Sequence, residues 1–446
     1  MNKNILSWLI IVLTFCMISS CKEDDENIMT TDCYISSFTL GYVKRQINTK
    51  TTSGKDTTYM VSYNAAYYPM AIDQLAGTIE NKDSLMTNSV VDAMLVSIES
   101  SGTVVYRKAD EIDGWRDFSI SDSIDFTTPL VFRVYTSDWS LWRDYAMKLN
   151  VHQQDGDAFV WNKLSESTAW STAETLKVLS WNDEIWVYAQ KEGNVCAYVN
   201  EKNGMPTWNE CVLNGCSLGD ISTIVPFQNR LYMNTTNGGV LVSDDGRDWM
   251  SVEMEQNVKL LSADNTTLYA LSEQGFWSSI DGETWVSEAG DSDLEYLPSH
   301  NISAVSFLQE NGVERTIVLG NRDILLYPGD KVSMVWSRRD VPNWTYFNDS
   351  PDNRFTCPRM ASSALIHYND ELLLFGQREQ SAEGQVLVSI DNGITWKTNS
   401  RYSFPINVVK QNLIYGVAVD SDNYIWFVTN DEVWKGRLNK FGFAHR

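Results

Sequence analysis

Short runs of alternating apolar and polar residues fill much of the chain, and a period of two predicts β-strands. Residues 33–153 hold about seven such runs with turn signals between them, which is typical of a small β-sandwich. In the last run, Tyr145, Met147, Leu149 and Val151 fall on one face, as a half-buried strand requires. We therefore expect an all-β fold that begins with a small sandwich.

A second pattern, a polar turn followed by a hydrophobic strand, recurs throughout residues 157–446. Its equivalent apolar positions, at steps of 37 to 55 residues, are Ile185, Leu231, Leu268, Ile317, Leu372 and Ile425. Recurrence at this spacing is the signature of a radial β-repeat, whose units stack to bury one core. The 290 residues of this segment hold six repeats, which predicts a six-bladed β-propeller. The polar, glycine-containing stretch at 153–157 indicates a linker in front of it.

The last repeat, from Leu413 to about Leu438, lacks a convincing fourth strand. The segment Phe159–Lys163 is similar to the strand that follows Trp396. If it pairs with the last repeat, the first and last units are joined and no sheet edge stays open. We predict this closure.

Three hairpin turns share a Ser-x-Asp…Gly…Trp pattern. Their residues are Ser243, Asp245, Gly246 and Trp249; Ser279, Asp281, Gly282 and Trp285; and Ser389, Asp391, Gly393 and Trp396. Ser and Asp are expected to hydrogen-bond within the turn, Gly to adopt a positive φ, and Trp to pack between blades. We interpret these residues as structural.

The first 20 residues predict a signal peptide, with Lys3 as the positive region and residues 5–17 as a short apolar stretch. The sequence Ile18-Ser19-Ser20-Cys21 resembles a bacterial lipobox, which implies acylation of Cys21. Residues 21–32 then form an acidic tether, similar to the export signal of lipoproteins on the outer surface of the outer membrane. We expect a cell-surface protein whose membrane contact is the lipid anchor alone.

Net charge and motif content restrict the ligands and binding partners that we expect, and the cysteines leave two possibilities for disulfide bonding. The chain holds 58 acidic and 35 basic residues, a net charge of −23, which makes nucleic acid an improbable partner. No phosphate loop, dinucleotide fingerprint or metal-ligand spacing occurs, so no cofactor or metal is expected. Five cysteines follow Cys21: Cys33, Cys196, Cys211, Cys216 and Cys357. A pair between Cys196 and Cys211 and isolated buried thiols both remain open.

The three turns resemble the Asp-boxes of sialidases and related six-bladed propellers, and residues 358–376 resemble a kelch repeat. The whole chain is similar to an uncharacterised family of Bacteroidota surface lipoproteins with a signal, an Ig-like domain and a propeller. The Ig-like module lacks the Cys…Trp…Cys pattern of true immunoglobulin domains. Sialidase activity is not expected, because the first arginine of the sialidase cluster has no counterpart between Trp161 and Asn182.

One segment stands out as a candidate binding loop, on the propeller face opposite the Ser-x-Asp turns. Its residues are Arg338, Arg339, Trp344, Tyr346, Phe347 and Arg354. Exposed aromatic rings beside arginines suit sugar stacking or a protein partner, whereas the alternative is that Trp344 and Phe347 only cover a blade junction.

Our leading hypothesis is a non-catalytic lipoprotein whose propeller binds a glycan or an envelope protein. The alternative is a glycoside hydrolase, other than a sialidase, that uses a pair of carboxylates on the propeller face. A deep funnel lined with acids favours the enzyme, and an aromatic rim favours binding.

Overall fold

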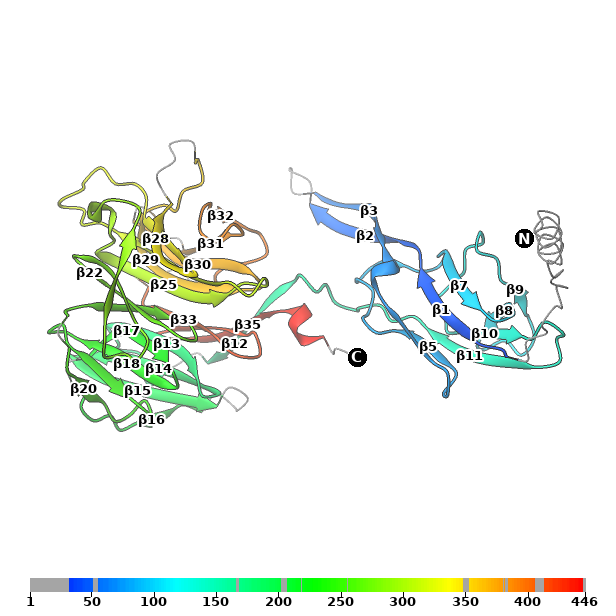
Figure 1. Cartoon of the computed structure of the whole chain (residues 1–446), viewed down its shortest axis with the longest axis horizontal. Helices are drawn as coiled ribbons and strands as arrows, with labels where there is room; N and C mark the ends of the chain where they lie inside the picture. The colour runs from blue at the N-terminus through cyan, green and yellow to red at the C-terminus, as the bar shows by residue number, and fades with distance from the viewer. Residues whose placement is uncertain are drawn as a thin grey trace, which may run out of the picture. The chain divides into compact units, whose positions relative to one another are not determined.

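The computed structural model divides into two compact units, an N-terminal unit of Met1–Gly156 with Phe443–Arg446, and a C-terminal unit of Asp157–Gly442 (Figure 1). The structure describes residues 32–443 except 51–54, 166–167, 202–206, 218, 255, 348–352, 380, 382–383 and 406–412. Within these ranges no α-helix occurs, and the 3-10 turns are η1 (Ala65–Tyr67), η2 (Leu294–Tyr296) and η3 (Asn439–Gly442). The all-β prediction is therefore confirmed.

The N-terminal unit is built from three sheets, with strand orders β1-β7, β4-β5-β11-β10-β8-β9 and β3-β2-β6. The bounds are β1 Ile35–Leu40, β2 Tyr42–Lys50, β3 Asp56–Asn64, β4 Met70–Asp73, β5 Thr78–Asn81, β6 Ser89–Val90, β7 Val96–Ser100, β8 Thr103–Lys108, β9 Arg116–Asp117, β10 Leu130–Tyr135 and β11 Trp142–Lys148. Phe38 of β1 meets Phe132 of β10 edge to face, with ring centroids 5.4 Å apart, so the two-stranded sheet packs on the six-stranded one. Tyr145 and Met147 are both buried on one face of β11, as their alternation predicts.

The C-terminal unit consists of four four-stranded sheets and one eight-stranded sheet. Their strand orders are β13-β14-β15-β16, β17-β18-β19-β20, β21-β22-β23-β24-β28-β27-β26-β25, β29-β30-β31-β32 and β12-β35-β34-β33. The eight-stranded sheet is two four-stranded antiparallel units whose last strands, β24 and β28, pair in parallel at Ala289–Asn343 and Gly290–Trp344. The first strands neighbour one another in the order β13, β17, β21, β25, β29 and β33, and β33 contacts β13, so they close a ring.

The strand bounds of this unit are β12 Phe159–Ser165, β13 Thr175–Trp181, β14 Glu184–Lys191, β15 Asn194–Glu201, β16 Asn209–Cys211, β17 Gly219–Phe227, β18 Arg230–Thr235, β19 Val240–Ser243, β20 Met250–Val252, β21 Lys259–Ala263, β22 Leu268–Ser272, β23 Gly275–Ser279, β24 Val286–Gly290, β25 His300–Leu308, β26 Glu314–Asn321, β27 Met334–Arg339, β28 Val341–Tyr346, β29 Met360–Tyr368, β30 Glu371–Arg378, β31 Gly384–Ser389, β32 Lys397–Thr398, β33 Tyr415–Val419, β34 Ile425–Thr429 and β35 Val433–Leu438.

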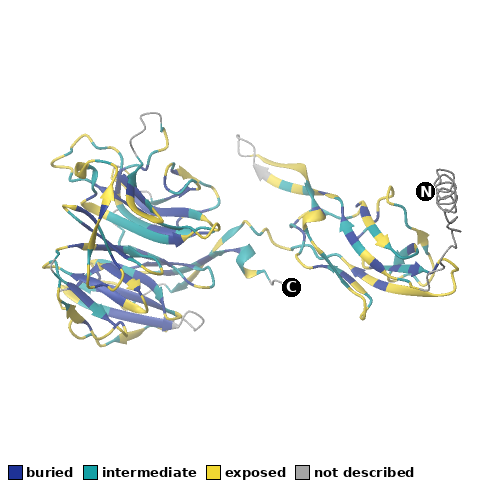
Figure 2. Ribbon diagram, viewed as in Figure 1, coloured by how far each residue is buried: buried dark blue, intermediate teal, exposed yellow. Residues whose placement is uncertain are grey.

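The repeat read from the sequence marks the second strand of each unit. Its apolar positions are Ile185, Leu231, Leu268, Ile317, Leu372 and Ile425, and each is at most 1% exposed. Figure 2 shows buried residues concentrated in the strands of each unit and exposed ones in the connections. One sheet cannot bury both of its faces, so each packs its apolar residues against its neighbours.

The predicted closure is confirmed. β12 pairs antiparallel with β35 from Phe159–Leu438 to Ser165–Val433, and thereby supplies the fourth strand of the last sheet. Gly436 of β35 is required there, because a Cβ atom would lie 2.5 Å from the Trp161 ring and 2.6 Å from the Phe159 ring.

The three Ser-x-Asp turns connect third to fourth strands, and the Ser and Asp side chains bond within each turn. The Ser hydroxyl donates to the Asp carboxylate at 3.1, 2.9 and 2.8 Å in the first, second and third turn. The turn glycines Gly246, Gly282 and Gly393 have φ of 74°, 79° and 99°, where a side chain would be strained. Trp249 and Trp396 are buried, whereas Trp285 is partly exposed.

All five cysteines in the described part of the chain are free thiols. Cys196 and Cys211 lie on the neighbouring strands β15 and β16, but the register places Ala197 opposite Cys211. Successive residues of a strand point to opposite faces, so the two thiols enter different hydrophobic clusters. This geometry does not bring them together as a disulfide.

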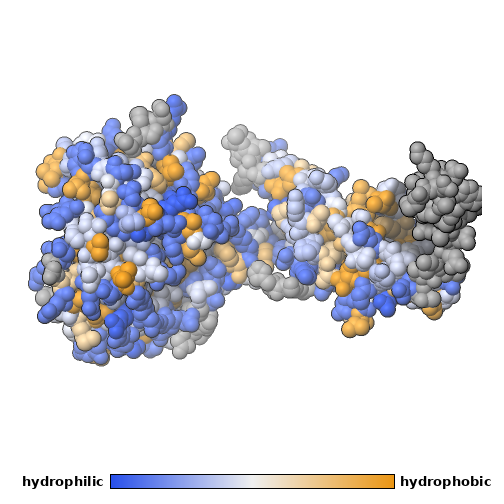
Figure 3. All heavy atoms as spheres, in the orientation of Figure 1, coloured by the Kyte–Doolittle hydropathy of each residue, from blue (hydrophilic) through white to orange (hydrophobic). Residues whose placement is uncertain are grey.

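The predicted signal peptide, Cys21 and the acidic tether up to residue 31 lie outside the described residues. Among the residues that are described, no helix is long and apolar enough to cross a membrane. Figure 3 shows hydrophilic residues over much of the visible surface of the propeller, in keeping with the net charge of −23.

Candidate functional site

The first strands of the six four-stranded units surround a cavity of about 190 Å³ on the propeller axis, here called the central channel. Each first strand contributes to its wall. The lining residues are Leu176, Lys177, Val178, Ser222, Lys259, Leu260, Leu261, Ile302, Ser303, Ala304, Ser363, Ala364, Leu365, Tyr415, Gly416 and Val417. The volume exceeds what one water needs but is below that of a pocket for a whole drug-sized ligand.

The channel residues belong mostly to the beginnings of their strands, such as Lys177 in a strand that starts at Thr175. Antiparallel strands alternate in direction, so turns after the first and third strands lie at one end of a unit. The Ser-x-Asp turns follow third strands. The central channel therefore lies toward the opposite end of the propeller.

Two lysines enter the central channel from different units, Lys177 from β13 and Lys259 from β21. Desolvation lowers the pKa of the Lys177 ammonium to about 8, although the charge of Asp220 opposes this shift. Lys177 Nζ donates to the carbonyl of Ser222 at 3.4 Å. Among the described residues, the lining contains no Asp or Glu. The channel thus carries positive charge within a strongly acidic protein.

The predicted binding loop is mainly a strand, and this expectation was wrong. Residues Val341–Tyr346 form β28, which makes a hairpin with β27 through the single residue Asp340. A hairpin between third and fourth strands lies at the same end as the Ser-x-Asp turns, not opposite them. The sequence cannot distinguish an exposed loop from an edge strand when both are rich in Trp, Tyr and Arg.

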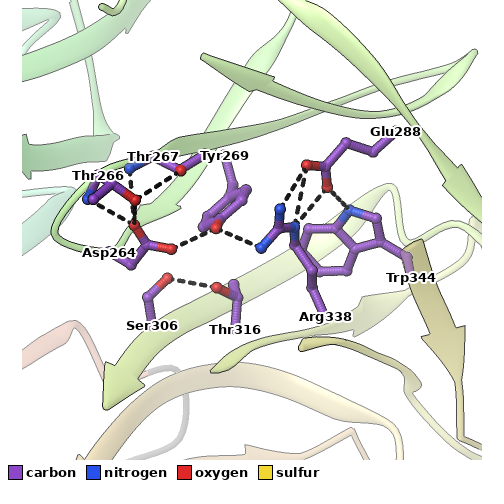
Figure 4. Close-up of polar contacts among 9 residues, drawn as sticks. All are labelled: Asp264, Thr266, Thr267, Tyr269, Glu288, Ser306, Thr316, Arg338 and Trp344. Carbon is purple, nitrogen blue, oxygen red and sulfur yellow. Dashed lines mark hydrogen bonds and ion pairs between the residues drawn. The ribbon is translucent and has the colours of Figure 1, made fainter. Parts of the chain in front are cut away.

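Trp344 is buried and Arg338 is largely buried, and both join the two four-stranded units of the eight-stranded sheet (Figure 4). Three contacts of 2.8 to 3.1 Å connect the Arg338 guanidinium to the Glu288 carboxylate of β24. Trp344 Nε1 donates to the same carboxylate at 2.7 Å. Trp344 is fully buried and stacks on Phe276 with centroids 3.9 Å apart, so it offers no ring to a sugar.

The buried network continues inward from Arg338. Its Nη1 donates to Tyr269 Oη at 2.9 Å, and that hydroxyl donates to Asp264 Oδ2 at 2.5 Å. Figure 4 shows these side chains directed toward one another. Burial raises the pKa of Tyr269, so its phenol stays protonated. The alternative interpretation, that this segment covers a blade junction, fits the contacts of Trp344.

The other four predicted residues do not form one surface with these two. Tyr346 stacks on Tyr296 with centroids 4.9 Å apart, and Phe347 packs against a hydrophobic cluster. Arg339 and Arg354 are exposed.

A second hollow, here called the acidic groove, lies where β13, β17, β21 and β25 end. It measures about 570 Å³ and is lined by Trp181, Pro226, Phe227, Gln228, Asn229, Ala263, Asp264, Asn265, Ser306, Phe307, Leu308 and Glu314. Asp264 accepts bonds from the N–H groups of Thr266 and Thr267, each at 2.8 Å, in addition to the Tyr269 hydroxyl. Desolvation and the charges of Asp264 and Asp340 raise the pKa of Glu314. The groove therefore holds two carboxylates in unlike environments.

Sequence reasoning missed Lys177 and Lys259. Each interrupts an apolar run, Leu176-Lys177-Val178 and Val258-Lys259-Leu260, that precedes a repeat turn. A lysine inside the innermost strand of a repeat was the available signal. No group of three or more His, Cys, Asp or Glu side chains is placed to hold a metal ion in the described ranges.

Comparison with protein families settles the relationship of the chain. Residues 155–446 match the DUF6242 β-propeller domain, and residues 38–149 match the DUF6242 N-terminal domain, a domain of unknown function. The chain belongs to the DUF6242 family. Together the two domains cover most of the chain, and no curated protein matches it significantly.

Solved structures with a similar fold have low sequence identity to this DUF6242 protein. The Hadza microbial sialidase Hz136 is 14% identical with a TM-score of 0.40, over 92% of this chain and 93% of that one. YCF48 bound to a D1 peptide is 12% identical with a TM-score of 0.38, over 63% and 96%. The α-L-arabinanase of Penicillium chrysogenum, complexed with arabinobiose, is also 12% identical with a TM-score of 0.38, over 62% and 96%. At these values the likeness carries no argument about activity.

Proposed function

We propose that this DUF6242 protein is a non-catalytic surface lipoprotein whose propeller binds a glycan or an envelope protein through the central channel and the surrounding face. The observation that carries the proposal is the channel lining, whose described residues include two lysines and no carboxylate. Glycoside hydrolysis ordinarily needs two carboxyl groups across the scissile bond, and the channel offers none. A propeller also holds loops from every blade on one rigid rim, which suits recognition.

The membrane attachment in this proposal rests on the sequence. Ile18-Ser19-Ser20-Cys21 supports acylation of Cys21, and the acidic residues after it support display outside the outer membrane. The N-terminal sandwich would then act as a spacer between the lipid anchor and the propeller. Its Ig-like character is part of the proposal.

The second candidate function is a carbohydrate-active enzyme that uses the acidic groove. The observation in its favour is the pair Asp264 and Glu314, of which Glu314 has a raised pKa, as a general acid requires. Against it, Asp264 already accepts bonds from the Thr266 and Thr267 amides and from Tyr269, which is how a turn is stabilised.

A combined assay separates the two functions. Purified full-length protein is tested on a glycan array, in cross-linking to intact outer membranes, and for release of reducing sugar from the same glycans. Retention of a glycan or an envelope protein without product supports the binding proposal. Product release that Glu314→Gln abolishes, and that the exposed neighbour variant Glu310→Gln retains, identifies the enzyme instead. Absence of any retained glycan or cross-linked protein refutes the binding proposal.

A further inference from the structure

The two channel lysines form no ion pair within the part of the chain that the structure describes, although the charge of Asp220 acts on Lys177. The described residues of the channel lining include no acid. Lys177 donates only to a backbone carbonyl, at 3.4 Å. The groups that share its surroundings are Asp220 and the Ser222 carbonyl from β17 and Lys259 from β21, whereas the described residues of β25, β29 and β33 contribute no charged side chain to the lining.

Lys177 is partly withdrawn from water and forms no ion pair, which raises the free energy of the empty channel, whereas Lys259 is exposed at the channel wall. An anion in the channel that contacts Lys177 reduces that cost and forms a charge-assisted hydrogen bond, and Lys259 lines the same cavity as a second cation. Lys177 and Lys259 are 82 residues apart in sequence, and each comes from the first strand of a different sheet. Their presence in one cavity therefore depends on closure of the ring, which makes the charge a property of the folded channel.

The net charge of −23 restricts what kind of anion can enter. The negative charge of the whole protein repels a polyanion. A single anionic group on a neutral chain is instead attracted by the nearby lysines of the channel. The cavity of about 190 Å³ is below the usual size of a pocket for a whole ligand, so it fits one terminal group. The lining mixes three serines, Ser222, Ser303 and Ser363, with aliphatic residues, as the hydroxyls and C–H faces of a sugar ring require.

We propose that the central channel binds the carboxylate of a hexuronate at the end of an otherwise neutral glycan, with Lys177 and Lys259 as its two cationic contacts. This inference rests on the proposed glycan-binding function and names the ligand class for it. The sugar hydroxyls meet the channel wall, and the neutral part of the glycan extends over the face opposite the Ser-x-Asp turns.

The test uses purified full-length protein and isothermal calorimetry at pH 7. The probes are a neutral oligosaccharide that ends in glucuronate, its glucose-terminated counterpart, and a neutral peptide with a free C-terminal carboxylate. We expect the glucuronate probe to bind at least about tenfold more tightly than the glucose probe, the scale of a hydrogen bond to a charged group. Raised salt should weaken the glucuronate complex only.

Variants locate the binding. Lys177→Met and Lys259→Met should each weaken glucuronate binding by about tenfold or more, and Lys177→Arg should retain much of it, because the charge is kept. Lys331→Met is the matched control, since Lys331 is exposed in the connection between β26 and β27. Thermal unfolding of each variant establishes that the propeller is folded before affinities are compared.

Each contrary outcome has a distinct meaning. Equal binding of the glucuronate and glucose probes keeps the glycan-binding function and overturns the carboxylate site. Preference for the peptide carboxylate overturns the glycan assignment. Full glucuronate affinity in folded Lys177→Met and Lys259→Met proteins overturns the role of the channel. Failure of every glycan and of every envelope protein to bind refutes the proposed function itself.

Discussion

Arg338→Met tests whether the buried network holds the two halves of the eight-stranded sheet together. The side chain of Glu288 is 2% exposed and that of Arg338 is 12% exposed, so neither charge regains water when its partner is lost. Removing one member of such a pair leaves an uncompensated buried charge, which costs about 3–5 kcal/mol. At roughly 2–4 °C per kcal/mol for a unit of this size, the melting temperature of the propeller should fall by about 6–20 °C.

The assay is thermal and urea unfolding of full-length proteins at pH 7, followed by tryptophan fluorescence. Arg339→Met is the matched control, because Arg339 is the exposed neighbour in the same strand, and its loss should change stability by less than about 0.5 kcal/mol. The double variant Arg338→Met with Glu288→Gln removes both charges and keeps an acceptor for Trp344 Nε1. It should recover about half or more of the loss, since a neutral buried pair leaves no unpaired charge.

Two results would refute this reasoning. Equal stability of the Arg338→Met and Arg339→Met proteins would mean that the ion pair contributes nothing measurable. A double variant no more stable than Arg338→Met would assign the loss to packing of the arginine side chain and not to the unpaired Glu288 carboxylate.

Three further predictions concern other parts of the propeller. Gly436→Ala should destabilise it by about 1–3 kcal/mol in urea unfolding, because the new Cβ meets the Trp161 ring, whereas Gly329→Ala, with no atom within 4 Å, should be neutral. The turn amides of Thr284 and Glu283 lower the pKa of Asp281 to about 2, below its unfolded value. The stabilisation that the Asp281 carboxylate gives the folded protein is therefore present above about pH 4 and lost as the pH falls toward 2. In the Asp281→Asn variant the free energy of unfolding should depend less on pH in this acid range. Glucuronate binding should weaken as pH rises through about 8, where Lys177 loses its charge, and Lys177→Arg should shift that decline above pH 9 in calorimetry.

Much of the fold could be predicted because its information is local. The apolar residue at Leu231 or Ile317 lies next to its own turn, and that pairing recurs in each unit. The serine, aspartate and glycine of each Ser-x-Asp turn likewise lie within a few residues of one another, so the contacts of the hairpin can be read from the motif. Closure by Phe159–Lys163 was inferable from a missing strand at the other end of the repeat.

The candidate site could not be predicted in the same way. Arg338 and Trp344 are residue types that are common in binding loops. In the structure both donate to Glu288, 50 residues before Arg338, and this contact holds them between two four-stranded units. Burial of an aromatic ring or a guanidinium depends on which strand edge lies beside it, and the pairing of β24 with β28 is a long-range contact without a motif.

By itself the sequence determined the β-repeat, the turns that build it and the strand that closes it, because each depends on residues close in the chain or on a recurring period. Tertiary structure alone decided which charged groups are paired. Glu288 neutralises Arg338 across the two four-stranded units of the eight-stranded sheet, whereas Lys177 and Lys259 line one channel whose described residues include no carboxylate. Ring closure fixes these distances, and no local pattern encodes the geometry of a closed ring.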